Sequence, residues 1–208
     1  MNVLTILQLA TALLLTRVSE LKTGVQILLV QSAIVALACV RAGWESGEIH
    51  MYAAAVLTVV IKVVIIPYAM FNILVKLRKE KEVNPILSYN RSSLVAGVAI
   101  VLSYSLVDQA LPGMLNRDAL ATSVSMMLIG LLLIMTRRQA IMQIVGLITM
   151  ENGIYLMGLS VTKGLPLIIE LGIFFDVLVA VVVLVILTRR LKLSFMSTDT
   201  SMLKKLKG

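Results

Sequence analysis

Seven long apolar segments constrain how this chain can fold. In chain order they cover residues 2–16, 23–40, 50–75, 93–111, 119–136, 140–161 and 165–188. A helix needs roughly 20 mostly apolar residues to cross the hydrocarbon core of a bilayer. The composition agrees with such helices, because 59% of the residues are hydrophobic and only 14% are charged, against about 25% charged in soluble domains. We therefore predict an all-α integral membrane protein with about seven transmembrane helices.

The first segment is the shortest of the seven and would rise only about 22 Å as a helix. No basic residue precedes it, and no clear small-residue cleavage site follows it, so it does not match a signal peptide. We expect a retained helix that continues toward Leu21.

The basic residues predict the orientation of the chain in the membrane. Fifteen of the 19 lysines and arginines follow the first, third, fifth and seventh segments, three follow the other segments, and Lys62 lies inside the third. Basic connections stay in the cytoplasm. We therefore expect an outside N-terminus, a cytoplasmic C-terminus and a multi-pass protein of the cytoplasmic (inner) membrane, which requires an odd number of helices.

The connections divide the chain into four parts. Residues 1–75 form a three-helix membrane segment, and residues 76–92 form a basic cytoplasmic loop interrupted by Asn84-Pro85. Residues 93–190 form a four-helix membrane segment, and residues 191–208 form a basic cytoplasmic tail.

Several function classes are excluded or disfavoured. Cys39 is the only cysteine, so the chain alone cannot form an internal disulfide, a cysteine-ligated zinc site or an iron–sulfur cluster. The net charge of +8 lies mostly between the apolar segments, without the basic and aromatic stripe of a nucleic-acid face. Phosphate loops, nucleophile elbows and metal-ligand motifs are also missing from the sequence. We expect no catalytic, cofactor or metal site in this chain.

Four ionisable residues lie inside the apolar segments. Lys62, Glu151 and Asp176 fall near the middle of their segments, and Glu170 falls nearer the outer end of its own. An ionised side chain at the centre of a membrane helix costs about 2.5–3.5 kcal/mol. One interpretation is a proton or ion pathway, and the other is a buried Lys62–carboxylate pair that fixes helix register. We favour the pathway, because one lysine cannot neutralise three carboxylates.

Three neighbouring residues support that interpretation. Tyr155 shares a helix face with Glu151 by four-residue spacing, and Asn152 adds an amide one position later. Pro67 cannot donate a backbone hydrogen bond, so it predicts a kink in the helix that carries Lys62. A kink beside a buried ammonium suits a hydrated cavity, although a proline kink without function fits the pattern equally well.

These residues resemble a known family, hydrogenase-4 component E. The resemblance covers most of the chain and rests on residues 137–146, residues 150–153 (Met-Glu-Asn-Gly), residues 170–173 (Glu-Leu-Gly-Ile) with Asp176, and Lys62 with Pro67. The last three segments also resemble the K-type membrane subunit of respiratory complex I, whose last two helices each carry a buried glutamate on the proton route. The glutamate of its third helix matches Asp176. The glutamate of its second helix falls at Ile148, and this chain offers Glu151 three residues later.

The resemblance implies a membrane subunit of a group 4 nickel–iron hydrogenase or formate hydrogenlyase-type complex. Nickel–iron and iron–sulfur centres would then belong to cytoplasmic partner subunits, and antiporter-like membrane subunits would be its neighbours. Lys62, Glu151 and Asp176 would relay protons or sodium ions, and Glu170 would be an outer exit. The chain would be non-catalytic alone, as part of a membrane-bound oxidoreductase.

Three alternatives remain open at this point. The chain could be a small subunit of a multi-subunit cation/proton antiporter, which would have no redox partners. It could be a structural adaptor that docks a hydrogenase to the membrane without conducting ions. It could also be a free-standing seven-helix transporter or receptor, although it has no long ligand-binding loop.

Overall fold

In the computed structural model, every element of the described chain is helical. The structure describes residues 3–47, 49–77, 85–113 and 116–162, and the single positions 179, 182, 183 and 186. The elements are α1 (Val3–Arg17), α2 (Leu21–Ser46), α3 (Ile49–Thr58), the π-helix η1 (Val59–Ile65), α4 (Ile66–Leu77), α5 (Tyr89–Ala110), α6 (Arg117–Thr136) and α7 (Ala140–Thr162).

Five helices of this part of the chain are long and apolar enough to cross a membrane. They are Leu21–Glu45, Ile49–Val75, Tyr89–Ala110, Arg117–Thr136 and Ala140–Val161. The helix Val3–Arg17 is also apolar but shorter. The all-α prediction is confirmed for the described residues, and these five helices match the second to sixth predicted segments. The seventh predicted segment, residues 165–188, lies outside the described residues except for four positions.

The expected continuation of the first helix toward Leu21 is wrong. The helix ends at Arg17, and α2 begins at Leu21 after three non-helical residues. The end has a physical reason, because the side chain of Arg137 donates a hydrogen bond to the Thr16 carbonyl oxygen. In a continuing helix that oxygen would accept the backbone N–H four residues later.

The third span is continuous but not α-helical throughout. It passes from α3 through η1 into α4, and the Ile66 N–H bonds to the Ile61 carbonyl oxygen, five residues earlier. Pro67, which has no N–H to donate, follows immediately. The residue that predicted a kink therefore lies next to a stretch of π-helix, which is itself a recognised cause of helix bending.

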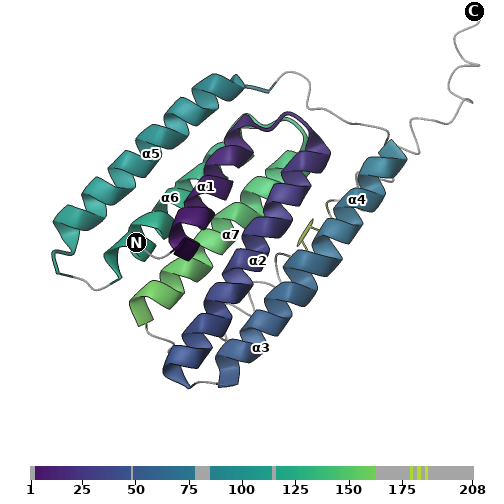
Figure 1. Ribbon diagram of the computed structural model, residues 1–208. Coiled ribbons are helices and arrows are strands. Elements are labelled where there is room, and N and C mark those ends of the chain that lie inside the picture. The colour runs from purple at the N-terminus through teal and green to yellow at the C-terminus, as the bar shows by residue number, and fades with distance from the viewer. Residues whose placement is uncertain are drawn as a thin grey trace, which may run out of the picture.

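The helices run up and down, so their connections alternate between two ends (Figure 1). The α1–α2 and α6–α7 connections lie at one end, which we call the α1–α2 end. The α2–α3 and α5–α6 connections lie at the other, the α2–α3 end. Helix α7 packs against α6 on one side and α2 on another, while α1 packs against α2, α5 and α6. Helix α7 thus lies within the bundle, and it carries the charged residue Glu151.

Glycines bring α6 and α7 into direct backbone contact. A Cβ atom on Gly130 would lie 2.5 Å from the Met150 nitrogen, and one on Gly153 would lie 2.8 Å from the Ser123 carbonyl oxygen. Gly146 is equally close to Gly130. Small residues allow membrane helices to approach in this way, and the contact fixes the position of α7 beside α6.

The main hydrophobic core joins most of the helices. Leu15, Leu28, Ile66, Met126 and Val145 belong to it, and so do Val179 and Val183 from the last predicted segment. Large apolar side chains also cover the outside of the bundle, such as Leu94, Val98 and Val101 on α5. Such an exterior suits a lipid environment, as expected for a multi-pass membrane protein.

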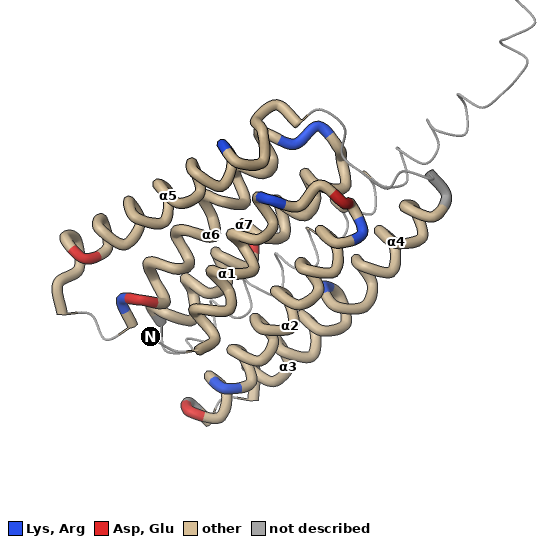
Figure 2. The backbone as a smooth tube through the Cα atoms, turned by 45° about the horizontal axis from the view of Figure 1, so that its top comes forward, with Lys and Arg blue, Asp and Glu red and all other residues tan. Residues whose placement is uncertain are grey.

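The charges of the described residues are distributed unequally between the two ends (Figure 2). The α1–α2 end carries Arg17, Glu20, Lys22, Arg91, Arg137 and Arg138. The α2–α3 end carries Arg41, Glu45, Asp108, Arg117 and Asp118. Arg41 pairs there with Glu45 at 2.9 Å, and Arg117 pairs with Asp108 at 2.6 Å. The positive surplus therefore lies at the α1–α2 end.

Candidate functional site

The centre of the candidate site is an ion pair between Lys62 of η1 and Glu151 of α7. The lysine Nζ lies 3.3 Å from Glu151 Oε1, and the two side chains are only 1% and 3% exposed. Both residues lie near the middle of their spans. Pairing removes much of the cost of an isolated charge at that depth, and the short distance suits proton transfer.

Asn152 is a second partner of Lys62. Its Oδ1 atom accepts a hydrogen bond of 3.1 Å from the lysine Nζ. Its Nδ2 atom donates on the opposite side, to Gln31 Oε1 and to Ser32 Oγ of α2, each at 3.4 Å. The amide is completely buried, so these bonds define its orientation. The structure therefore brings together three of the predicted site residues, Lys62, Glu151 and Asn152.

The two other supporting residues also lie near this pair. Tyr155 is buried, and the centroid of its ring is 5.9 Å from Lys62 Nζ. A ring face at this distance attracts a cation. Pro67 is buried one turn beyond the π-helical segment that carries Lys62. π-Helical turns occur often at functional sites.

A buried polar chain continues from Asn152 toward α1, and the sequence analysis missed it. Gln31 Oε1 also accepts a hydrogen bond of 3.2 Å from Thr149 Oγ1, and the Gln31 backbone oxygen accepts one of 3.1 Å from Gln8 Nε2. Gln8, Gln31 and Thr149 are all buried. Amide side chains within apolar segments were the signal that could have identified the two glutamines, because such groups are costly to bury alone.

Arg137 is a second deeply buried cation, at the α6–α7 connection. Its side chain is fully buried and bonds to the Thr16 carbonyl oxygen. Its guanidinium lies 4.7 Å from the centroid of the Tyr89 ring. Arg137 therefore joins the end of α1, the start of α5 and the α6–α7 connection, whereas Arg138 is exposed. Two adjacent arginines of a predicted topology signal thus have different environments.

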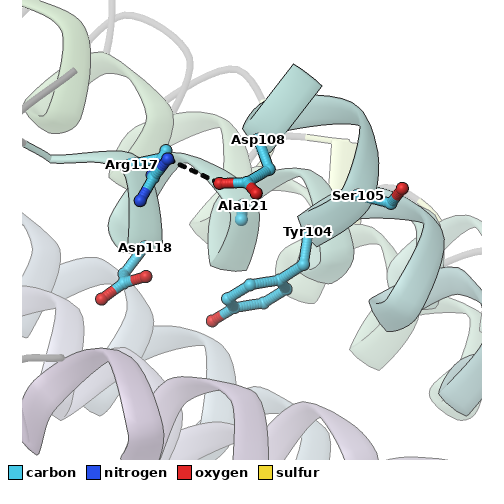
Figure 3. Close-up of a pocket in the computed structure, with 6 residues that line it drawn as sticks. All are labelled: Tyr104, Ser105, Asp108, Arg117, Asp118 and Ala121. Carbon is cyan, nitrogen blue, oxygen red and sulfur yellow. Dashed lines mark ion pairs between the residues drawn. The ribbon is translucent and has the colours of Figure 1, made fainter. Parts of the chain in front are cut away.

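A cavity of about 290 Å³ opens at the α2–α3 end, between α5 and α6 (Figure 3). Tyr104, Ser105, Asp108, Arg117, Asp118 and Ala121 line it. Asp108 and Arg117 form an ion pair there, with both side chains largely exposed. Tyr104 bonds through its hydroxyl to Thr122 Oγ1 at 2.9 Å. This cavity is separate from the Lys62–Glu151 pair along the chain, and its charges are accessible to solvent.

Two predicted site residues, Asp176 and Glu170, lie outside the described residues. In the part of the chain that is described, no group of three or more His, Cys, Asp and Glu side chains is placed to hold a metal ion.

Comparison with known proteins identifies distant relatives along nearly the whole chain. An uncharacterized protein of Mycobacterium tuberculosis, Rv0085, is 26% identical over 205 residues, which cover 97% of this chain and 92% of that protein. Hydrogenase-4 component E of Escherichia coli K12 is 29% identical over 185 residues, which cover 88% of this chain and 83% of that protein. The component of the same name in Shigella flexneri shows the same identity and coverage. No protein-family model and no solved structure matches the chain. The chain is therefore distantly related to hydrogenase-4 component E.

Proposed function

We propose that this chain is a membrane subunit of a group 4 hydrogenase or formate hydrogenlyase-type complex, in which it helps to translocate protons or sodium ions. The relation to hydrogenase-4 component E and the five apolar helices support a membrane subunit of a hydrogenase complex. The observation that carries the ion-translocation part is the buried Lys62–Glu151 pair in the middle of two spans. Ionisable groups at that depth are expensive and usually functional.

The proton chemistry of the pair is simple. Transfer of one proton from the Lys62 ammonium to the Glu151 carboxylate gives a neutral amine and a neutral carboxylic acid. Neither product carries a charge that the apolar surroundings would penalise. Glu151 then passes its proton to Asp176, Glu170 serves as the outer exit, and a proton from the cytoplasm recharges Lys62.

In this proposal the chain has seven transmembrane helices, with the N-terminus outside and the C-terminus in the cytoplasm. The positive surplus at the α1–α2 end supports a cytoplasmic location of that end. The membrane is the inner cell membrane. Antiporter-like membrane subunits and cytoplasmic hydrogenase subunits are the partners, and the nickel–iron and iron–sulfur centres belong to those subunits.

The proposal is tested with the assembled complex in inverted membrane vesicles, by measuring ion uptake for each turnover of the redox reaction. We expect Lys62→Met and Glu151→Gln each to reduce proton uptake about tenfold or more while the complex stays assembled. A tenfold loss corresponds to about 1.4 kcal/mol. Glu45→Gln is the matched control, because Glu45 belongs to an exposed ion pair at the end of α2. Normal coupled uptake by the Glu151→Gln, Asp176→Asn double variant, with the complex intact, overturns the proposal.

One observation favours a second candidate, a structural adaptor that conducts no ions. The Lys62 ammonium has both a carboxylate and an amide oxygen within reach, as a pair that only fixes helix register would have. This candidate predicts reduced assembly but normal coupling in the variants. A pull-down of the tagged chain in mild detergent separates the remaining alternative, since antiporter subunits without redox proteins would indicate a cation/proton antiporter.

A further inference from the structure

The amide of Asn152 has a defined direction between Lys62 and α2. Its oxygen faces the ammonium of Lys62 at 3.1 Å, and its nitrogen faces the acceptor oxygens of Gln31 and Ser32. The opposite orientation would direct an N–H group at an ammonium, which has only donors. The nitrogen must then find acceptors on the α2 side, and Gln31 Oε1 is one of them.

The amide of Gln31 is oriented in turn, and only one half of it is used. Its oxygen accepts from both Asn152 Nδ2 and Thr149 Oγ1. Its Nε2 atom is buried and has no hydrogen-bond partner among the described residues. A buried donor without a partner is costly, and reversal of this amide would offer its N–H groups to Thr149. Reversal is opposed because it would direct N–H groups at the N–H groups of Asn152.

We propose that Gln31 is a positioning residue for Lys62, and that it acts through Asn152. The Gln31 oxygen holds the Asn152 amide with its own oxygen toward the lysine, so that the ammonium keeps its place beside Glu151. The role of Gln31 in transport rests on the proposed function, whereas the orientation of the two amides does not.

The orientation makes a sharp distinction between two substitutions of Gln31. Gln31→Met keeps the length of the side chain but removes the oxygen that Asn152 needs. Gln31→Glu keeps that oxygen and replaces only the nitrogen, which bonds to no described residue. We expect proton uptake in vesicles to fall about tenfold in Gln31→Met, a change equivalent to about 1.4 kcal/mol, and to return to within about twofold of wild type in Gln31→Glu. Gln26→Met and Gln26→Glu are the matched controls, since Gln26 is an exposed glutamine of the same helix.

A spectroscopic measurement tests the positioning without any transport. The full chain is labelled with ¹⁵N-asparagine in lipid nanodiscs, and the side-chain amide signal of Asn152 is identified by its loss in Asn152→Asp. We expect a single signal with a proton contact to Ser32 in the wild type and in Gln31→Glu. In Gln31→Met we expect the signal to broaden or double, because the amide then samples both orientations.

Two results overturn the inference. One is a Gln31→Met protein that matches Gln26→Met in both the uptake and the amide signal. The other is a Gln31→Glu protein as impaired as Gln31→Met, which would mean that the Gln31 nitrogen is the group in use. If the Lys62 and Glu151 variants transport normally, the proposed function fails, and the Asn152 signal still decides the role of Gln31.

Discussion

A lysine in the middle of a membrane span is stable only if its ammonium has partners. Lys62 has Glu151 Oε1 at 3.3 Å and Asn152 Oδ1 at 3.1 Å, and the face of Tyr155 lies nearby. Removing one member of a buried ion pair leaves the other charge without compensation in apolar surroundings. The two members therefore depend on each other more than either contributes alone.

This dependence predicts a non-additive double-mutant cycle. We expect Lys62→Met and Glu151→Gln each to lower the free energy of unfolding by about 3–5 kcal/mol, and the double variant to lose much less than the sum. Unfolding of the purified protein in lipid or detergent measures the three values. The exposed Arg41–Glu45 pair is the control, with an expected coupling of about 0.2–1 kcal/mol. Additive losses at Lys62 and Glu151 would show that the pair does not interact.

The sequence predicts these charged residues better than it predicts their surroundings. Lys62 and Glu151 are conspicuous because charges are rare in apolar segments. Gln8 and Gln31 were passed over, because an uncharged amide in such a segment costs less and is less conspicuous. Which residues meet also depends on how each helix is rotated about its axis, and the π-helical turn changes that rotation in a way that no residue pattern specifies.

At the scale of the elements, apolar length predicts the existence of the helices but not all of their ends. Six predicted segments correspond to helices, while α1 ends at Arg17 because a distant arginine caps its last turn. The contact between α6 and α7 depends instead on glycines, at which a Cβ atom would meet the backbone of the other helix. A backbone atom cannot move aside as a flexible side chain can.

We therefore expect Gly130→Ala to lower the free energy of unfolding by about 1–3 kcal/mol, as overpacking does. Gly97→Ala is the matched control on α5, where a Cβ atom would meet nothing within 4 Å. There the substitution should be neutral or slightly stabilising, because alanine has the higher helix propensity. Thermal unfolding of the two purified variants measures the difference. Equal stabilities would contradict the close α6–α7 contact.

At the scale of the whole molecule, the two ends of the bundle differ in charge as the two sides of a membrane do. Arginines at the α2–α3 end are paired with carboxylates, whereas basic residues outnumber acidic ones at the α1–α2 end. The alternation of the connections could be predicted from sequence, because basic residues follow every second apolar segment.

Cysteine labelling tests this orientation. After Cys39→Ala, single cysteines are introduced by Glu45→Cys and Leu111→Cys at the α2–α3 end, and by Glu20→Cys and Ser88→Cys at the other. All four positions are exposed, and none of them is basic. We expect an impermeant thiol reagent to label the first two in intact cells and the last two only after permeabilisation. The reverse pattern would place the N-terminus in the cytoplasm.

The π-helical segment η1 has a mechanical consequence for the whole bundle. A π-turn contains one residue more than the corresponding α-turn, and successive residues of an α-helix differ by about 100° in direction. If η1 rewound into an α-helix, one half of the third span would therefore turn about its axis relative to the other half. Such a turn would swing the Lys62 ammonium away from α7. Contact between the two charges is thus coupled to the winding of a single helical turn.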